Sequence, residues 1–334
     1  MTRGAPSRNE ELVASLARAV EDALDTAIPA NRPVALLDFP GYGNVGDSMI
    51  WLATVEYLRR RGARIAYSCD LTTYSRETLV RRLPAGTVLL SGGGNLGDLW
   101  ESHQAMRENA IRQLGAYRIV QLPQSIRFRS AAALERAAGV CDDHPDLTLL
   151  VRDRESLAVA RAHFRAQSTL APDVSFLLGV LGSPGTQRRD TVWLLRTDHE
   201  RAERPLSHPE GGAPPMDWVT DDRTALWRLH GVIRHLLADH PRALRWLRTP
   251  LSATYAPLAR QRLRRGIALL RGAREVVTDR LHGHILCVLL GIEHYLVDDR
   301  YGKLRAFHET WTSSCDLAHW ADAAPRPEWS VRCT

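Results

Sequence analysis

The sequence predicts an α/β protein with a doubly wound parallel sheet, and three observations lead to this fold class. Short apolar segments typical of buried strands alternate with segments of helical period. Glycine-rich loops follow several of the predicted strands, where sheets of this class bind their ligands. The chain of 334 residues is also longer than one hydrophobic core usually supports, so we expect two domains.

The N-terminal part alternates strands and helices with short connections. Apolar positions at helical spacing predict a first helix over 9–26. Glycine-rich loops follow the first and third strands. The predicted strands are 33–39, 64–68, 87–91, 117–122 and 147–151, and the remaining helices are 48–61, a short one ending at 83, 102–114, 130–141 and 153–165.

A Gly-, Pro- and Ser-rich stretch over 179–190 marks a domain boundary, so the predicted domains are residues 1–180 and 181–334. The polar stretch 197–215 is predicted to be a mobile loop. The second domain is predicted to contain strands at 191–195, 275–277 and 295–297, and helices around 222–239, 255–271 and 285–290.

The composition is that of a globular protein, with 44% hydrophobic and 25% charged residues. No apolar run is long enough to span a membrane, and the first residues do not resemble a signal peptide, so we expect a cytoplasmic protein. The net charge is +6, and all but one of the 44 basic residues are arginines, with Lys303 the only lysine. This arginine excess suits anionic small molecules or an anionic membrane surface.

Two classes of ligand are not expected. No basic stripe interleaved with aromatic residues is present, so we predict no nucleic acid partner. The five cysteines are scattered, and the histidines, including the pair His282 and His284, lack the spacing of zinc or iron ligands. We therefore predict no metal site.

The segment 278–284 is the main candidate for a functional site. It follows an apolar strand and precedes an apolar helix, so Arg280 and His282 lie at a strand-to-helix junction, where free N–H groups favour an anion. The guanidinium can hold a phosphate or carboxylate while the imidazole moves a proton. The alternative is a buried arginine paired with Asp279 and a histidine satisfied in the core.

The segment 41–46 matches the Gly-x-Gly-x-x-Gly dinucleotide fingerprint, and Asp70 lies where a ribose-binding acid is expected. An NAD-dependent oxidoreductase is therefore one hypothesis. Pro40 stiffens the turn and the Asp47 carboxylate repels a pyrophosphate, and both features argue against it. The alternative is a turn that brings backbone N–H groups and Asn44 close to another ligand, with Asp47 in that site or serving as a helix cap.

A second flexible loop, 92–95, contains Gly93, Gly94 and Asn95 after the third predicted strand. Consecutive glycines are costly to order, so we expect this backbone to approach a ligand or the facing domain closely. The loop lacks the Lys-Ser/Thr pair of a nucleotide triphosphate site.

Three further arginines follow predicted strands. Arg152 and Arg154 lie at one strand-to-helix corner, where they either bind an anion or pair with the acidic residues beside them. Arg196 follows the first strand of the second domain and faces the expected cleft. His103 and Asp173 are weaker candidates, for which surface and turn roles are favoured.

Taken in chain order, these loops resemble the polysaccharide pyruvyltransferase family. The similarity extends from about residue 33 to about residue 305, and it is greatest to the bacterial exopolysaccharide branch, in which the segment 195–198 also has a counterpart. The matching segments are 43–47, 92–95, 98–100, 152–156, 172–173 and 280–283, followed by Asp299 with Lys303.

The resemblance implies two Rossmann-like domains with the active site in the cleft between them, similar to the glycosyltransferase-B architecture. It implies phosphoenolpyruvate as donor and co-substrate, a sugar with two suitably placed hydroxyls as acceptor, and a pyruvate ketal and phosphate as products. It implies no metal and no nucleotide cofactor. In the Arg-x-His motif of the family the arginine binds the donor and the histidine is catalytic, and these residues are Arg280 and His282 here.

The expected chemistry divides the remaining candidates between donor and acceptor. Ketal formation protonates the enol carbon while a sugar hydroxyl loses a proton, and we expect His282 to act as general acid/base. A lipid-linked oligosaccharide as acceptor implies peripheral contact with the inner face of the membrane. The predicted donor-side residues are Arg280, Arg152, Arg154, Arg196, Gly283 and Lys303, and the predicted acceptor-side residues are Asn44, Asp47, Gly93, Gly94 and Asn95.

Two alternatives stay open at this point. One is the NAD-dependent oxidoreductase, and the other is a carbohydrate-binding relative that has lost turnover. The insertion around 199–215 and the region 243–254 match nothing in the family pattern, so they leave the acceptor specificity open.

Overall fold

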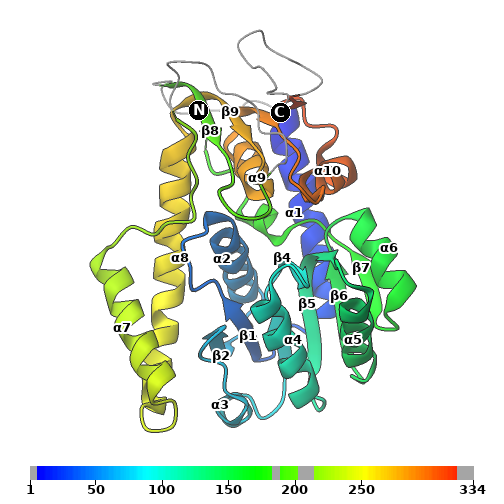
Figure 1. Cartoon of the computed structure of the whole chain (residues 1–334), viewed down its shortest axis with the longest axis vertical. Helices are drawn as coiled ribbons and strands as arrows, with labels where there is room; N and C mark the ends of the chain where they lie inside the picture. Colours follow the sequence, from blue (N-terminus) through cyan, green and yellow to red (C-terminus); the bar gives the residue numbers. More distant parts are fainter. Residues whose placement is uncertain (1–5, 183–188, 202–213, 322–334) are drawn as a thin grey trace.

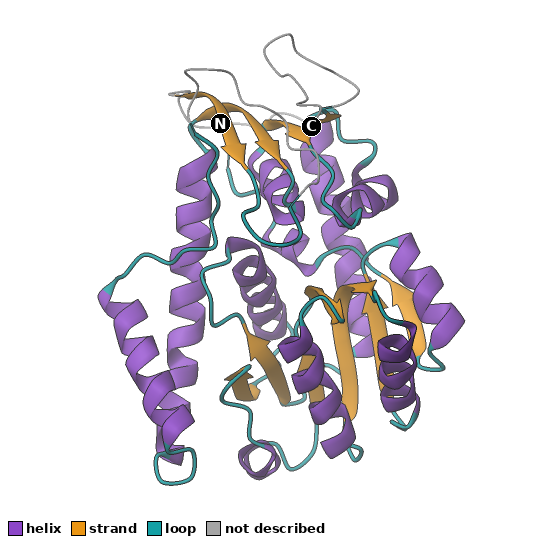
Figure 2. Cartoon of the chain, viewed as in Figure 1, coloured by secondary structure: helices purple, strands orange, loops and turns teal. Residues whose placement is uncertain are grey.

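The computed structural model describes residues 6–182, 189–201 and 214–321. It confirms the α/β class, because the strands form two parallel sheets that are flanked by helices (Figures 1 and 2). Most of the predicted loop at 197–215 and part of the linker at 179–190 lie outside the described residues.

The first sheet has seven parallel strands in the order β2-β1-β3-β5-β6-β7, with β4 paired to the end of β5. Central strands such as β1 are buried along their whole length, as parallel strands covered on both faces must be. The strands are β1 (Val34–Phe39), β2 (Ile65–Asp70), β3 (Thr87–Leu90), β4 (Gly93–Gly97), β5 (Arg118–Arg127), β6 (Leu147–Val151) and β7 (Gln167–Leu170).

Most helices of this part begin at a side-chain cap. Asn44, Ser75, Ser130 and Asp153 each accept a hydrogen bond from a backbone N–H of the first turn, which satisfies donors that have no partner within the helix. The helices are α2 (Val45–Arg60), α3 (Arg76–Arg82), α4 (Glu101–Gln113), α5 (Ala131–Asp142) and α6 (Arg154–His163).

The second sheet has four parallel strands in the order β11-β10-β9-β8. The strands are β8 (Arg189–Leu194), β9 (Ala273–Thr278), β10 (Glu293–Leu296) and β11 (Ala318–Trp320). The remaining helices are α1 (Arg8–Ala27), α7 (Ala225–Asp239), α8 (Arg248–Leu270), α9 (Leu281–Leu290) and α10 (Lys303–Phe307).

Two long helices pack against the cores of both sheets. In α1, Val13 belongs to the core beside the second sheet and Leu24 to the core beside the first. In α8, Tyr255 belongs to the first core and Leu270 to the second, and Figure 1 shows this helix running alongside both sheets. The boundary at residue 180 stays a prediction, because the two halves share these helices.

Some elements differ from those expected from sequence. The glycine-rich segment after β3 forms β4, whose Leu96 pairs with Ile126, rather than a loop. The short edge strands β7 and β11 have little apolar pattern and were not predicted. Helix α8 starts at Arg248, before the predicted residue 255. Pro250 does not prevent this start, since it lies in the first turn, where proline is tolerated, and the helix continues through Pro257.

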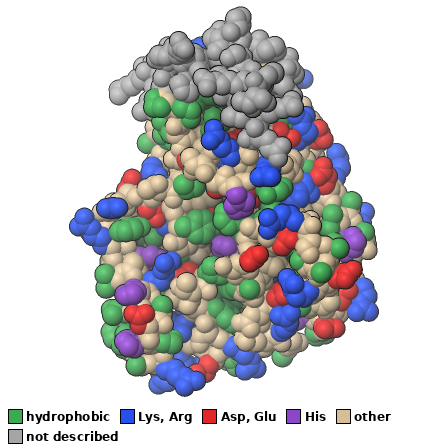
Figure 3. All heavy atoms as spheres, in the orientation of Figure 1, with side chains coloured by type: hydrophobic (Ala, Val, Ile, Leu, Met, Phe, Trp, Pro, Cys, Tyr) green, Lys and Arg blue, Asp and Glu red, His purple; other side chains and the backbone are tan. Residues whose placement is uncertain are grey.

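Three features of the described residues concern membranes, metals and cysteines. No helix among them is long and apolar enough to cross a bilayer. No group of three or more His, Cys, Asp or Glu side chains within them comes together to hold a metal. The four described cysteines are free thiols, and Cys333 lies outside the described residues. On the face shown in Figure 3, basic and acidic side chains are interspersed.

His284 belongs to a buried network with a fixed direction. The Ile292 carbonyl can only accept, so His294 donates to it from Nδ1 at 2.8 Å. The remaining nitrogen of His294 then accepts from His284 Nδ1 at 2.7 Å, and His284 Nε2 accepts from the Thr312 hydroxyl at 2.8 Å. Burial lowers the pKa of both imidazoles, so both are neutral and this direction holds. The expectation of a histidine satisfied in the core therefore applies to His284 rather than to His282.

We expect the free energy of unfolding to fall as the pH drops from 7 to 5. Burial lowers the pKa of His230 and of His294 to about 4, whereas an unfolded histidine titrates near 6.5. The unfolded chain therefore binds more protons below pH ~6.5, so this stability is complete above that pH and is lost toward pH 4. Each histidine contributes a loss of about 2 kcal/mol at pH 5. Urea unfolding at both pH values measures the slope.

The substitution His230→Asn provides the control for that slope. The Nδ1 atom of His230 lies 2.8 Å from Thr254 Oγ1, and an asparagine amide can donate from a similar position without titrating. The variant should be less stable at pH 7 but lose less stability between pH 7 and 5. An unchanged slope would contradict the role of buried neutral imidazoles.

Candidate active site

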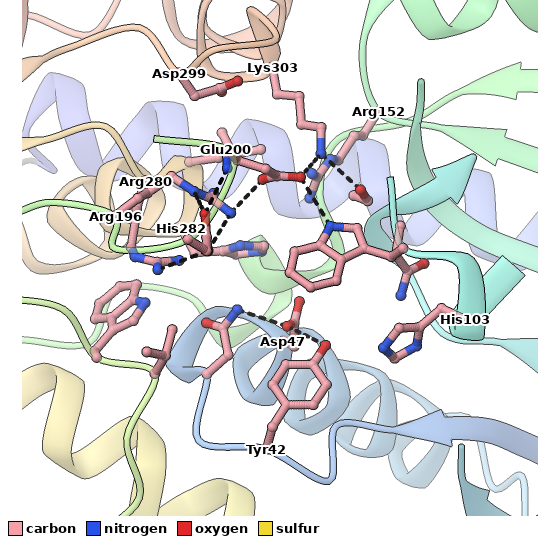
Figure 4. A pocket seen from close by; sticks show the side chains of 18 residues that line it. Tyr42, Asp47, His103, Arg152, Arg196, Glu200, Arg280, His282, Asp299 and Lys303 are labelled. Atoms are coloured by element: carbon pink, nitrogen blue, oxygen red, sulfur yellow. Dashed lines mark hydrogen bonds and ion pairs between the residues drawn. The ribbon is translucent and has the colours of Figure 1, made fainter. Parts of the chain in front are cut away.

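A cavity of about 350 Å³ lies where the carboxyl ends of the two sheets face each other (Figure 4). Its lining comes from the loops after β1, β6, β8, β9 and β10, together with β4 and the start of α4. Ligands of parallel sheets bind at this end of the strands. Nine of the twelve predicted site residues line it: Asn44, Asp47, Gly94, Asn95, Arg152, Arg196, Arg280, His282 and Lys303.

Arg152 is a buried cation on the cavity wall. Its Nε donates to Ser125 Oγ at 3.0 Å, and its Nη1 donates to Asp173 Oδ2 at 2.7 Å. A Cβ atom at Gly94 would lie 2.9 Å from Arg152 Nη2, so a glycine is needed for this close approach. A guanidinium carries five N–H donors, and Arg152 therefore keeps donors for a ligand.

Lys303, the only lysine of the chain, is another buried cation on the cavity wall. Its Nζ donates to the Gly94 carbonyl at 3.0 Å and to the Glu200 carboxylate. The two oxygens of Asp299 accept N–H groups at the start of α10 and fix the first turn that carries Lys303. Burial lowers the pKa of Lys303, although the negative charge of Glu200 opposes this shift.

His282 lies in the first turn of α9 and packs between Gly46 and a buried carboxylate. Its Nε2 is 3.4 Å from Asp173 Oδ2. Burial alone would raise the pKa of Asp173, but the charges of His282 and Arg152 hold it well below its usual range. Asp173 therefore stays ionised, and its carboxylate lies where it can orient the His282 ring. This aspartate was expected to have only a turn role.

The glycines of the segment 41–46 are required by protein contacts. A Cβ atom at Gly43 would lie 2.4 Å from the Val219 carbonyl oxygen, and one at Gly46 would lie 2.5 Å from the His282 ring. Real Cβ atoms do not approach this closely, so the loop needs glycines in order to pack against the C-terminal half. This packing accounts for the Gly-x-Gly-x-x-Gly pattern without a dinucleotide.

If His282 is catalytic as predicted, we expect Gly46→Ala to reduce turnover by about a hundredfold, because displacing a reacting group by about 1 Å has an effect of this size. The added methyl group must push the His282 ring away from its present position. The control is Gly139→Ala in α5, where a Cβ atom meets nothing within 4 Å. Steady-state rates and thermal unfolding should show a loss of activity without unfolding in the first variant, and full activity in the second.

Arg280 lies in the cavity wall, but it is paired with acidic side chains. Its Nη2 and Nε each lie 2.6 Å from an oxygen of Asp217, and Nη2 is 3.4 Å from Asp198. Arg196 pairs with Asp198 at 2.8 Å and with Glu200 at 2.5 Å. These two arginines therefore belong to an ion-pair network, and carboxylates already balance their charges. Sequence analysis gave a pair between Arg280 and Asp279 as the alternative. In the structure, Arg280 pairs with Asp217 instead.

Glu200 is a cavity residue that sequence analysis did not single out. Its buried carboxylate accepts a hydrogen bond from Trp100 Nε1 at 3.1 Å and also contacts Lys303 and Arg196 (Figure 4). Burial alone would raise the pKa of Glu200, but the charges of Lys303 and Arg196 lower it. Three donors converge on this carboxylate, so an anionic ligand that approaches Lys303 must share these donors with Glu200.

The opposite side of the cavity is formed by the loop after β1 and the start of α2. Asn44 caps α2, since its Oδ1 accepts from Gly46 N–H at 2.9 Å, so Asn44 and not Asp47 is the cap. Asp47 Oδ2 accepts from the Tyr42 hydroxyl and from Asn44 Nδ2, each at 2.9 Å. This side presents a carboxylate and neutral polar groups to the cavity.

Asn95 lines the cavity, but its side-chain oxygen is already engaged. It accepts from Arg107 Nη2 at 2.6 Å and from Gln124 Nε2 at 2.8 Å. The amide oxygen therefore holds β4 in place, and the backbone at Gly94 and Asn95 forms the cavity surface.

Three predicted residues do not line the cavity. Gly93 faces Asp47, with 3.6 Å between its added Cβ atom and Oδ1. A Cβ atom at Gly283 would lie 2.5 Å from Thr278 Oγ1, so this glycine serves packing. Arg154 is exposed, and its Nη1 donates to the backbone carbonyl of residue 309 at 3.4 Å. Their positions therefore do not support the prediction that these three residues contact the donor or the acceptor.

His103 lines the cavity, although a surface role was favoured for it from sequence. Its Nδ1 lies 2.8 Å from Asp38 Oδ2. Asp38 is buried and has a backbone φ of +68°, a conformation that residues other than glycine rarely adopt. No sequence signal marks this pair, because Asp38 reads as part of an apolar strand and His103 as one polar residue of a helix.

Comparisons with known proteins agree on one family. A sequence model described as "Polysaccharide pyruvyl transferase" matches residues 44–300. Pyruvyl transferase 1 of Schizosaccharomyces pombe is 31% identical over 300 residues, which cover 86% of this chain and 71% of that protein. A protein named putative pyruvyl transferase EpsO, from Bacillus subtilis, is 29% identical over 304 residues, covering 89% of this chain and 90% of that protein.

A solved structure with a similar fold is also known. It is an uncharacterised protein of Klebsiella pneumoniae that covers 90% of this chain and 96% of its own, with a TM-score of 0.58 and 18% sequence identity. At this identity the likeness concerns the fold alone.

Proposed function

The chain belongs to the polysaccharide pyruvyl transferase family, and we propose that it transfers the pyruvyl group of phosphoenolpyruvate to two hydroxyls of a sugar, forming a pyruvate ketal and releasing phosphate. One observation carries the proposal. His282, beside an ionised aspartate, opens into the same cavity as two buried cations that keep free donors, Arg152 and Lys303.

The donor side follows from the charges of phosphoenolpyruvate. This molecule carries a phosphate and a carboxylate on one small carbon frame, and both groups are preferred ligands of guanidinium and ammonium donors. Arg152 and Lys303 approach Gly94 from two directions, so two anionic groups can be bound side by side there. Arg280 and Arg196 line the same cavity, and their charges are balanced by Asp217 and Asp198.

The chemistry proposed for His282 is proton donation to the enol carbon. Protonation at C3 makes C2 electrophilic, and a hydroxyl of the acceptor can then form a bond to C2. The ionised Asp173 lies 3.4 Å from His282 Nε2 and can hold the ring in place for this step. General acid catalysis of this kind contributes a factor of roughly 10² to 10⁴ in rate.

The acceptor is proposed to bind on the side of the cavity formed by Asn44 and Asp47. Carboxylate and amide groups suit sugar hydroxyls, and the described residues that line this side of the cavity include no lysine or arginine. The two parallel sheets with a cavity at their carboxyl ends support a glycosyltransferase-B type arrangement of two domains. A lipid-linked acceptor would bring the protein, acting in the cytoplasm, to the inner membrane surface.

The test of the function is turnover with phosphoenolpyruvate and a panel of alkyl hexosides that have free hydroxyls at C4 and C6. These hydroxyls can close a six-membered ketal ring. We expect phosphate release that depends on the hexoside, with one phosphate for each ketal methyl group detected by NMR. Binding of phosphoenolpyruvate without release of phosphate from any hexoside would favour the carbohydrate-binding relative instead.

A further inference from the structure

We propose that His103, positioned by Asp38, is the general base that removes the proton from the acceptor hydroxyl. The inference rests on the proposed function and deepens it. His282 is assigned to the proton that the donor gains at C3, so it cannot also take the proton that leaves the acceptor hydroxyl in the same step. A second group is therefore needed on the acceptor side.

Asp38 occupies a β-bulge at the end of β1. Leu37 pairs with Cys69 and Phe39 pairs with Asp70, so Asp38 is an extra residue between two consecutive partners on β2. Bulges re-aim side chains and are frequent beside active sites. The φ of +68° at Asp38 is a strained conformation for this residue type, and strain of this kind persists where the surrounding structure enforces it. The bulge directs the carboxylate toward α4.

The contact with Asp38 fixes the state of His103. A carboxylate can only accept, so Nδ1 carries the proton and donates to Asp38 Oδ2 at 2.8 Å. In the neutral ring, Nε2 is then the acceptor, and no hydrogen-bond partner for it is present among the described residues. The ring lines the cavity, on the same side as Tyr42 and Asp47 (Figure 4). An imidazole with one nitrogen held by a carboxylate and the other free is the usual form of a histidine base.

The charges around His103 support this role. Burial alone would lower its pKa, but the hydrogen bond to Asp38 and the charges of Asp38 and Asp47 raise it above the ordinary value. Arg107, on the same helix, opposes the shift. The Tyr42 ring packs edge-on with its centroid 5.9 Å from that of His103. A base is more effective when its pKa is raised toward the working pH.

The proton balance of the reaction closes with these two histidines. As the first acceptor oxygen bonds to C2, His103 takes its proton and His282 gives a proton to C3, which becomes the methyl carbon. The second hydroxyl then bonds to C2, and the bond from C2 to the phosphate oxygen breaks with its electron pair leaving on phosphate. The second hydroxyl proton leaves with that group as HPO₄²⁻. Exchange with solvent returns both histidines to their starting states.

The test compares His103→Gln, Asp38→Asn and the control His163→Gln, whose side chain is exposed at the end of α6. We expect His103→Gln to lower kcat by a factor of roughly 10² to 10⁴ while the Kd for phosphoenolpyruvate changes less than about twofold. Asparagine tolerates the backbone conformation at position 38, so Asp38→Asn should fold. The control should match the wild-type protein.

The pH profile separates a base from a structural residue. His103 must be neutral to act, so kcat/KM for the hexoside should rise with pH through its pKa. Removing the Asp38 charge lowers that pKa, so in Asp38→Asn the acidic limb should move to lower pH and the plateau should fall. If the wild-type protein releases no phosphate, the proposed function fails. If it does and His103→Gln keeps its rate, or the limb stays in place, only the role of His103 is overturned.

Discussion

Replacing His282 with alanine is expected to abolish turnover and leave phosphoenolpyruvate binding largely intact. The imidazole supplies the proton for the enol carbon, and loss of general acid catalysis lowers kcat by a factor of roughly 10² to 10⁴. Donor binding should survive because Asp173 keeps its 2.7 Å contact with Arg152 after the ring is removed. The buried carboxylate is therefore not left without a partner, and Arg152 stays in position.

Rapid-quench measurement of phosphate release, together with calorimetric titration of phosphoenolpyruvate, checks both parts of this expectation. Asp173→Asn is a useful companion variant, since it removes the charge 3.4 Å from His282 Nε2 but keeps the shape. It should lower the rate less than His282→Ala does. Full activity in His282→Ala would remove the proposed role of the histidine.

Replacing Lys303 with methionine is expected to weaken phosphoenolpyruvate binding by roughly 10- to 100-fold. A hydrogen bond to a charged group is worth about 1.5–3 kcal/mol, and about 1.4 kcal/mol corresponds to a factor of ten in affinity. The loss is reinforced because Glu200, which now contacts Lys303 and Arg196, would face the donor with less of its charge compensated. Methionine keeps most of the apolar stem, so the packing of α10 should persist.

The matched control is Arg305→Gln, which removes a cation from the same helix. Arg305 does not line the cavity, and its Nε donates to Asp298 at 3.0 Å. Calorimetry should show unchanged donor affinity in this control and a raised Kd in Lys303→Met. Equal affinities in both variants would mean that Lys303 does not contact the donor.

The fold class was predictable from sequence because it depends on local patterns. Buried parallel strands such as β1 are continuous apolar runs, and the helices that follow start at Asn, Ser or Asp caps. The position of the site was predictable for the same reason, since loops at the carboxyl ends of strands are where such sheets bind ligands. Arg152 and His282 were found in this way and Lys303 through the family resemblance, and the structure brings all three to one cavity.

The pairings within the cavity were not predictable, because they join residues far apart in the chain. Arg280 is followed by a helix and preceded by Asp279, but its carboxylate partner is Asp217, from a segment without a motif. Glu200 contacts Trp100 across the two halves of the chain, and it contacts Lys303 from a distant part of its own half. From sequence, Arg196 and Arg280 were predicted to bind an anion. In the structure, these contacts pair both arginines with carboxylates.

Asp38 illustrates a second limit. In the sequence it is one acidic residue within an apolar strand, and only the bulge in the pairing of β1 with β2 directs its side chain toward His103. Register irregularities depend on both strands at once. A single sequence gives no local signal for them, and a histidine such as His103 then resembles an ordinary helix residue.

The most direct measurement is a crystal structure of the protein with bound phosphoenolpyruvate. The proposed function predicts that the molecule lies in the cavity between the two sheets, with its two anionic groups on Arg152 and Lys303 and its C3 carbon beside the His282 ring. The acceptor side near Asn44 and His103 should remain open. Phosphoenolpyruvate bound elsewhere, or bound in the cavity with C3 turned away from His282, would contradict the central claim.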